Sequence, residues 1–277
     1  MGEAINPLIA MAIAEDLAGA SDITSNATIP AEQIDFAQFI TRKPGVIAGI
    51  SLAVDVLKYV GITEIDTSIS DGQSVAAGTV ILEARGRTRE LLLAERTALN
   101  FLSHLSGIAT ETRRWVDEIS KTSCQVRDTR KTTPGWRTLE KAAVRAGGGT
   151  NHRLSLSDAA LIKDNHIIAS GGALKAFELV RDAFPMKEIE IEVDTLDQLR
   201  EVLEGNPDLI LLDNMSPEMC REAVTIVGGR TKLEASGGIT FDKALKYAQT
   251  GVDYISIGSI THSAQALDIG LDFREEN

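Results

Sequence analysis

EIEIEVDTLDQLREVLEGNPDLILLDN, residues 188–214, is the stretch that decides the fold. Its first part alternates apolar and acidic residues through 194, and the run 209–212 is wholly apolar. Both patterns are typical of a β-strand. Between them, residues 196–205 have the apolar spacing of a helix, and Gly205 stands where helices commonly end. A strand, a helix and a second strand in so short a stretch predict a parallel βαβ unit.

The same alternation continues through the second half of the chain. Six strand candidates lie at 124–128, 159–162, 188–193, 209–212, 232–235 and 254–257. Five helix candidates lie between them, at 134–148, 173–184, 196–205, 217–229 and 240–251. Strict alternation of this kind predicts the α/β class with a parallel sheet. The pattern alone leaves open whether the sheet forms a barrel or a doubly wound layer.

The first hundred residues have a different pattern. Residues 37–50 and 68–86 indicate strands and turns, and one helix is predicted between them at 51–61. A long helical pattern then extends over 88–120 and is interrupted by Gly107. We place the boundary between two domains near this glycine.

The distribution of charge indicates the kind of ligand. The chain has a net charge of −12, but residues 127–153 hold seven cations against two anions beside the triplet Gly147–Gly149. Nucleic-acid-binding proteins usually show a wider basic surface, so a small and highly charged anion is the better prediction. No apolar run is long enough for a membrane span. Cys124 and Cys220 are far apart without metal-type spacing, which favours a reducing, cytoplasmic location.

Polar or small residues are expected at the carboxyl end of every predicted strand. In strand order they are Thr129, Arg130 and Lys131; Lys163 to His166; Glu190, Glu192 and Asp194; Asp213 and Asn214; Ser236, Gly237 and Gly238; and Gly258 and Ser259. Each set alone is typical of an ordinary loop. In a parallel α/β barrel, however, these ends meet at one face, where active sites lie. Six such sets together predict a functional site.

Two of these sets suggest particular chemistry. The turns SGG and IGS let backbone N–H groups approach a phosphate, although plain turns also favour Gly and Ser. The side chain of Glu192 would face the interior of a barrel, where a carboxylate needs a cation as its partner. Lys131 and Lys163 are the candidates. Glu192 and Asp213 could instead hold Mg²⁺ or bind a ribose. His152 beside Arg153 is a candidate contact for a carboxylate.

Seven motifs of the second half occur in a familiar order: DTRKTTPG, LEKAAVRAGGGTNHR, LIKDNH, EVDTLDQL, LLDNM, EASGGI and DYISIGS. AEDLAGASDITS and ERTALNFLSHLSGIAT precede them. On these motifs, which span almost the whole chain, the sequence closely resembles the quinolinate phosphoribosyltransferase family.

The resemblance implies a fold and a reaction. The fold would be an N-terminal α/β sandwich and dimerisation domain (1–107), an open TIM-like α/β barrel of about seven strands (108–265), and a segment returning to the first domain (266–277). The seventh strand would lie near 139–146 or before Arg127. The enzyme would be a pentosyltransferase that joins quinolinate to phosphoribosyl pyrophosphate with Mg²⁺. It would release pyrophosphate, CO₂ and nicotinate mononucleotide in de novo NAD biosynthesis.

The resemblance also implies roles for single residues. Thr129, Arg130, His152, Arg153 and Lys163 would bind substrate at the quinolinate pocket, with Lys131 at the reacting centre. Glu192 and Asp213 would be catalytic beside the ribose and Mg²⁺. The phosphate turns would be Ser236, Gly237, Gly238, Ile257, Gly258 and Ser259. Members of the family form homodimers, in which Arg96 would reach the partner subunit's site.

Two other interpretations were considered. A paralogue linked to molybdenum transport would keep the fold, but the complete LIKDNH motif argues against it. A non-catalytic phosphosugar- or nucleotide-binding protein could use the same barrel. Pure binding, however, does not need Glu192 beside Lys131.

Overall fold

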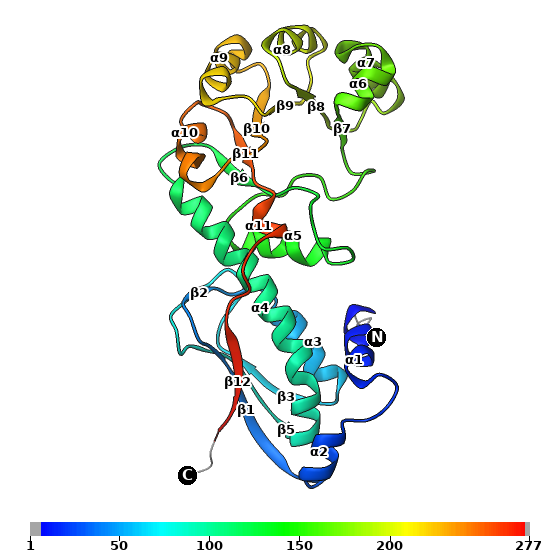
Figure 1. Cartoon of the computed structure of the whole chain (residues 1–277), viewed down its shortest axis with the longest axis vertical. Helices are drawn as coiled ribbons and strands as arrows, with labels where there is room; N and C mark the ends of the chain where they lie inside the picture. Colours follow the sequence, from blue (N-terminus) through cyan, green and yellow to red (C-terminus); the bar gives the residue numbers. More distant parts are fainter. Residues whose placement is uncertain (1–6, 275–277) are drawn as a thin grey trace. The chain divides into compact units, whose positions relative to one another are not determined.

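The computed structural model describes residues 7–274 of the chain, and Figure 1 shows its elements. The chain divides into two compact units. The first comprises residues 1–111, 145–147 and 264–277, and the second comprises 112–144 and 148–263. The predicted domain limits were 107 and 265.

The first unit is built on a four-stranded antiparallel sheet in the order β12-β1-β5-β3. These strands are β1 (Ile34–Thr41), β3 (Glu64–Thr67), β5 (Val80–Arg87) and β12 (Ile269–Phe273). The short strands β2 (Gly45–Val46) and β4 (Ser74–Val75) pair with each other. Its helices are α1 (Pro7–Leu17), α2 (Ile23–Thr28), α3 (Ile50–Tyr59) and most of α4 (Thr88–Glu118). Because β12 pairs with β1, residues 269–273 are part of this sheet.

Helix α4 corrects one prediction, because it is continuous through Gly107. The glycine has a packing reason instead. A Cβ at this position would overlap the backbone of Gln265 and Ala266, so only glycine lets that segment cross the helix. Although α4 is 31 residues long, no helix within residues 7–274 is both long and apolar enough to cross a membrane.

The second unit is built on a six-stranded parallel sheet in the order β6-β11-β10-β9-β8-β7. The strands are β6 (Gln125–Arg127), β7 (Ala160–Ile162), β8 (Ile189–Val193), β9 (Leu209–Asp213), β10 (Lys232–Ser236) and β11 (Tyr254–Ser256). The helices are α5 (Arg137–Ala146), α6 (Asp164–Ser170), α7 (Ala173–Ala183), α8 (Leu196–Val202), α9 (Pro217–Val227), α10 (Ala244–Ala248) and α11 (Ser259–His262). The short 3₁₀ turn η1 (Leu203–Gly205) follows α8, and the short 3₁₀ turn η2 (Phe241–Lys243) precedes α10. The predicted alternation of strands and helices is confirmed.

The parallel sheet is an open barrel, as predicted. Its first strand in the chain, β6, lies beside its last, β11, and within residues 7–274 β6 and β7 do not pair. The predicted site of a seventh strand, 139–146, is wrong, because this segment belongs to helix α5. Its buried positions, which include Lys141 and Val144, follow a helical spacing. A single parallel bridge between Arg127 and Thr150 stands at the free edge of β6.

The two faces of strand β8 differ in character. On β8, the side chains of Ile189, Ile191 and Val193 are almost fully buried and form the face packed against helices. Helices α7 and α8 contact this strand. Glu190 and Glu192 alternate with these residues and therefore face the barrel interior. The two carboxylates of β8 thus lie inside the barrel.

Candidate active site

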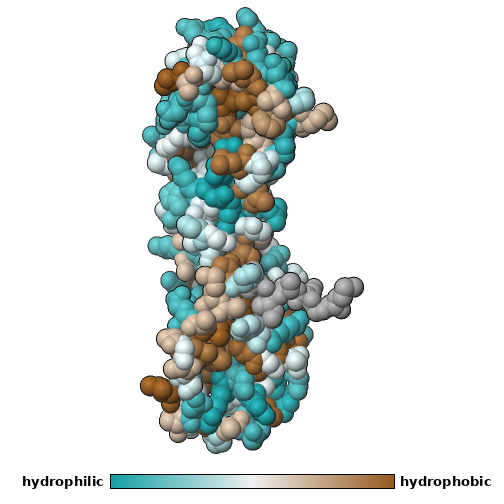
Figure 2. Space-filling view, turned by 90° about the vertical axis from the view of Figure 1, so that its right-hand side faces the viewer, coloured by the Kyte–Doolittle hydropathy of each residue, from teal (hydrophilic) through white to brown (hydrophobic). Residues whose placement is uncertain are grey.

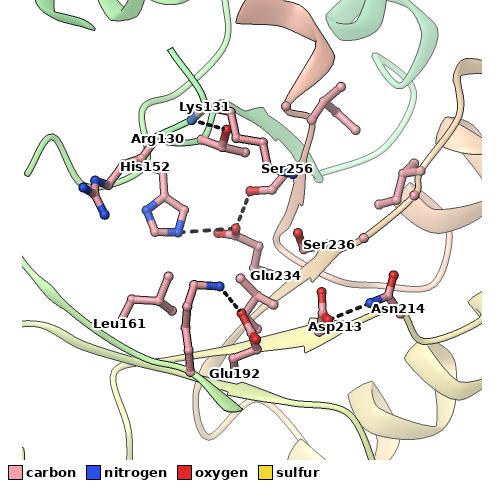
Figure 3. A pocket seen from close by; sticks show the side chains of 18 of the residues that line it. Arg130, Lys131, His152, Leu161, Glu192, Asp213, Asn214, Glu234, Ser236 and Ser256 are labelled. Carbon is pink, nitrogen blue, oxygen red and sulfur yellow. Dashed lines mark hydrogen bonds and ion pairs between the residues drawn. The ribbon is translucent and has the colours of Figure 1, made fainter. Parts of the chain in front are cut away.

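A cavity of about 740 Å³ lies at the carboxyl ends of the six parallel strands, within the second unit (Figure 3). Its lining consists of Thr129, Arg130, Lys131, His152, Arg153, Leu161, Lys163, Glu192, Leu211, Asp213, Asn214, Glu234, Ser236, Gly237, Gly238, Ile239, Ser256, Ile257, Gly258, Ser259 and His262. Every strand of the sheet is followed by, or contains, at least one of these residues. The parallel arrangement therefore brings together side chains that are far apart in the sequence.

Every residue that was predicted to bind substrate lines this cavity except Arg96. Arg96 lies on α4 in the first unit, and its side chain is 65 % exposed. The nearest carboxylate oxygen to its guanidinium is that of Glu95, at 3.9 Å. The predicted residues are thus assembled in space, while the role of each remains a prediction.

One wall of the cavity holds arginine donors without partners. The Nε atoms of Arg130 and Arg153 are buried and have no hydrogen-bond acceptor among residues 7–274. The Nη1 group of Arg153 donates to the Ala159 carbonyl at 3.0 Å, which fixes the direction of the side chain. Burial, and then the positive charge of Arg130, lower the pKa of Arg153. Two guanidinium groups in this state favour an anion between them.

Lys131 is held by its backbone rather than by its side chain. Its N–H donates to Thr129 Oγ1 at 3.0 Å, and its carbonyl accepts from the Thr261 hydroxyl at 2.8 Å. Within the described part of the chain, no ion pair is recorded for its ammonium group. The loop at the end of β6 therefore presents this cation to the cavity.

The opposite wall is acidic. Lys163 Nζ donates to Glu192 Oε2 at 2.6 Å, so Lys163 is the partner of Glu192 in this structure (Figure 3). Asp213 lies on the next strand, β9, and its Oδ2 accepts from Asn214 Nδ2 at 2.6 Å. The two carboxylates thus lie on neighbouring strands at the rim of the cavity.

The turn after β10 requires glycine at one position. Gly237 has a φ of 91°, in the region that side chains with a Cβ rarely adopt. A Cβ there would also overlap the side chain of Asn214. Position 237 is therefore restricted to glycine, and the absence of a side chain leaves the backbone of the turn accessible from the cavity.

A second set of polar side chains, which we call the buried layer, lies at the base of the cavity: Arg127, His152, Glu190, Glu234 and Ser256. His152, Glu234 and Ser256 are part of the cavity lining, whereas Arg127 and Glu190 are not. Glu234 is fully buried, and its Oε2 accepts from Arg127 Nη1 at 2.6 Å. The Ser256 hydroxyl donates to its other oxygen, as Figure 3 shows. Burial, and then the neighbouring Glu190, raise the pKa of Glu234. The cation of Arg127 opposes this shift.

His152 is held as a neutral ring. Its Nδ1 accepts from the Arg153 N–H at 2.8 Å, so the proton of the ring is on Nε2. Nε2 lies 2.9 Å from Glu190 Oε2 and 3.7 Å from Glu234 Oε1. Burial lowers the pKa of His152 to about 4, although Glu234 opposes the shift. Both ring nitrogens are therefore engaged within the chain.

The three side chains His152, Glu190 and Glu234 raise the question of a metal ion, since one ligand atom from each lies within 4.8 Å of the others. The tautomer of His152 argues against it. A metal on Nε2 would displace the ring proton while Nδ1 still accepts the Arg153 N–H, leaving an imidazolate. Glu190 Oε1 also has no partner, and burial raises the pKa of Glu190 to about 7. A partly protonated Glu190 is the simpler account of this cluster.

Glu234, Ser256 and Arg127 were not among the predicted site residues. Glu234 occupies the same face of β10 as Ser236, two residues earlier, so the period of two within KLEAS contained the signal. His262 also lines the cavity and was not predicted. For Arg127 the signal was its place in the basic segment, but its ion pair with Glu234 spans 107 residues of chain. No local pattern indicates such a pairing.

Comparisons with known proteins show which family the chain is part of. The family model described as "Quinolinate phosphoribosyl transferase, C-terminal domain" matches residues 108–272. The model described as "Quinolinate phosphoribosyl transferase, N-terminal domain" matches residues 22–106. The chain belongs to the quinolinate phosphoribosyltransferase family.

Curated relatives and solved structures of this family cover nearly the whole chain. The nicotinate-nucleotide pyrophosphorylase [carboxylating] of Mycobacterium leprae is 46 % identical over 98 % of this chain and 97 % of its own length. A probable enzyme of the same name from Bacillus subtilis is 41 % identical over 95 % and 91 %. The structure of the Francisella tularensis protein of that name superposes with a TM-score of 0.93 at 40 % identity, covering 98 % and 96 %. The family predicted from the motifs is confirmed.

Proposed function

We propose that the cavity of the second unit joins quinolinate to phosphoribosyl pyrophosphate and releases pyrophosphate, CO₂ and nicotinate mononucleotide. This is the reaction named in the curated relatives as nicotinate-nucleotide pyrophosphorylase [carboxylating] and quinolinate phosphoribosyltransferase [decarboxylating]. The observation that carries the proposal is the pair of buried arginine donors without partners, Arg130 Nε and Arg153 Nε, in a cavity that also holds two carboxylates and two small-residue turns.

Quinolinate fits the cationic wall because it carries two adjacent carboxylates. Arg130 and Arg153 offer planar donors that grip a carboxylate through two hydrogen bonds, which a lysine does not. Lys131 and Lys163 add point charges beside them. His152 borders this wall as a neutral ring and supplies shape rather than charge.

The acidic wall suits the other substrate. When pyrophosphate leaves, positive charge develops at C1 of the ribose, and Glu192 and Asp213 would stabilise it electrostatically. The turns at Ser236–Gly238 and Ile257–Ser259 would hold the 5-phosphate through backbone N–H groups. Carbanion character at ring C2 after loss of CO₂ is stabilised by the adjacent quaternary nitrogen. Positioning therefore accounts for the step without a protein nucleophile.

Magnesium fits the same rim. Mg²⁺ binds through one or two carboxylates together with substrate phosphates. Glu192 and Asp213 each have one oxygen engaged, by Lys163 and Asn214, and no hydrogen bond to the other oxygen is recorded among residues 7–274. The ion would neutralise part of the charge of pyrophosphate as it departs.

We further propose a homodimer in which Arg96 of one subunit contacts quinolinate in the other. Arg96 is exposed and lies outside the lining of its own cavity. The second unit also carries an apolar groove of about 820 Å³ beside β7 and α7, lined by residues that include Leu156, Leu179 and Phe184. Figure 2, which faces this side, shows hydrophobic side chains gathered over that part of the molecule. An exposed apolar surface of this kind supports an assembly. The cytoplasmic location remains a prediction.

The direct test is incubation of the purified protein with quinolinate, phosphoribosyl pyrophosphate and Mg²⁺. Chromatography should detect nicotinate mononucleotide and an equal amount of released pyrophosphate. Nicotinate in place of quinolinate is the matched control, because it lacks the carboxylate that is lost. Product from nicotinate but none from quinolinate would refute the proposal.

A further inference from the structure

An ion pair between Asp128 and Lys141 lies behind the cationic wall, and neither residue lines the cavity. Asp128 directly follows the last residue of β6 and is fully buried. Lys141 lies on α5 and is 1 % exposed. Lys141 Nζ donates to Asp128 Oδ1 at 2.5 Å and to the His152 carbonyl at 2.9 Å. The lysine thus connects helix α5 to both the end of β6 and the segment that carries His152.

Asp128 collects further donors from the same segment. Its Oδ1 accepts from the His152 N–H at 2.7 Å, and its Oδ2 accepts from Asn151 Nδ2 at 2.6 Å. Asn151 Nδ2 also donates to the Lys141 carbonyl at 3.0 Å. Both backbone polar groups of His152 are therefore bound, one by each member of the ion pair.

The next residue along the chain is Arg153. Its N–H donates to His152 Nδ1, so the ring of His152 and the backbone of Arg153 are fixed to each other. Beyond this bond, Arg153 carries one of the unpaired Nε groups of the cavity wall. A continuous set of hydrogen bonds thus leads from the Asp128–Lys141 pair to a residue proposed to grip quinolinate.

A buried ion pair is weak evidence for stability, because removing two charges from water costs much of what their attraction returns. A well-packed apolar pair would hold α5 against β6 as firmly. An apolar pair could not, however, bind the N–H and the carbonyl of His152. The hydrogen bonds, rather than the charges alone, distinguish this pair from ordinary core packing.

We propose that Asp128 and Lys141 are positioning residues, a clamp that sets the place of His152 and Arg153 and thereby the affinity of the site for quinolinate. The inference rests on the proposed role of Arg153. It predicts a selective effect, since the phosphate turns at Ser236–Gly238 and Ile257–Ser259 follow other strands, β10 and β11.

The test is steady-state kinetics of Lys141→Met with each substrate varied in turn. Displacing a positioned group by about 1 Å costs up to about a hundredfold, so KM for quinolinate should rise about tenfold or more. KM for phosphoribosyl pyrophosphate should stay within about twofold, as expected for a group that does not touch it. Lys121→Met, which removes an exposed lysine of the same unit, is the matched control and should leave both values unchanged.

A double variant keeps the test valid if a lone buried charge unfolds the protein. Asp128→Asn with Lys141→Met removes both charges and should raise the melting temperature above that of either single variant. It should still show the raised KM for quinolinate, because the bond to the His152 carbonyl is absent. A folded double variant with the wild-type KM would overturn the clamp, and so would an equal rise in both KM values.

Arg153→Ala separates this inference from the proposed function. If it leaves KM for quinolinate unchanged, the assignment of the cationic wall is wrong. If it raises KM for quinolinate while the folded clamp variants do not, the wall is correct and the clamp is wrong.

Discussion

In the buried layer Arg127 and the fully buried Glu234 meet at 2.6 Å, whereas in the adjoining wall Arg130 and Arg153 each have one guanidinium nitrogen without a partner among residues 7–274. Both regions use the same residue types on the same barrel. The two regions differ in the source of the group that pairs with each charged side chain. In the buried layer the chain supplies it, so those charges hold the structure. In the wall the partner is missing, as expected where a ligand supplies it.

The largest effect should come from the cavity wall. Lys131→Ala and Glu192→Ala should each lower kcat by about a thousandfold or more, as measured for groups that stabilise charge in a transition state. Neither change should alter the melting temperature much, because both residues face the cavity. The measurement is kcat together with thermal unfolding. Near-normal turnover in either variant would contradict the comparison.

A second test asks whether the wall is completed by another subunit. Arg96→Ala and Lys131→Ala homodimers should each be nearly inactive, but mixing them should form hybrids with one intact site. Random reassortment gives hybrids for half of the dimers, so about a quarter of the wild-type activity should return. Activity that stays at the level of the separate variants would exclude a role for Arg96 in trans.

The buried layer should respond in the opposite sense, with a loss of stability. Arg127→Met leaves Glu234 without its cation, and breaking a buried pair in this way typically costs about 3–5 kcal/mol. Denaturant unfolding should show this loss, and Arg127→Met with Glu234→Gln should recover part of it. An unchanged free energy of unfolding would mean that the ion pair in the buried layer does not stabilise the fold, and the contrast with the cavity wall would be wrong.

The smallest effect on function concerns the two buried cysteine thiols, which carry no charge at neutral pH. Burial raises the pKa of Cys124 and of Cys220 to about 12. Because these folded-state values lie above the usual 9.0, both thiols stay protonated below pH 9, and their contribution to stability is lost as the pH rises toward 12. Alkylation at pH 8 should be slower by about a thousandfold than in denaturant, in line with the lower thiolate fraction. Rapid alkylation of the native protein would show that these sites open.

Much of the site could be read from the sequence because a parallel barrel relates order along the chain to place. Arg130, Lys163, Glu192 and Asp213 each follow or end a strand, and strand ends of one direction meet at one face. Glu234 shows the limit of this reasoning. Its position within β10 was visible, but its pairing with Arg127 depends on the neighbouring strand β11 and the edge strand β6.

The helices show a similar limit. The local pattern at Gly107 indicates a break in α4, and the seven strands implied by the resemblance place a possible strand at 139–146, although the local pattern itself predicts a helix at 134–148. In the structure, the segment at Gln265 explains the glycine, and burial against β6 and the 150–153 segment explains the helix α5. The error at Gly107 thus concerns a contact between residues that are distant in sequence, whereas the helix at 134–148 was visible in the local pattern.

By itself, the sequence determined the α/β class, the alternation of strands and helices, the family and nearly all residues of the cavity, because periodicity and motif order are local properties of the chain. Only the tertiary structure decided which charges are paired and which are open. Lys163 rather than Lys131 binds Glu192, His152 carries its proton on Nε2, and Asp128 and Lys141 hold the segment behind the wall. These states depend on distances of a few ångströms between strands and on the exclusion of water, which no local pattern specifies.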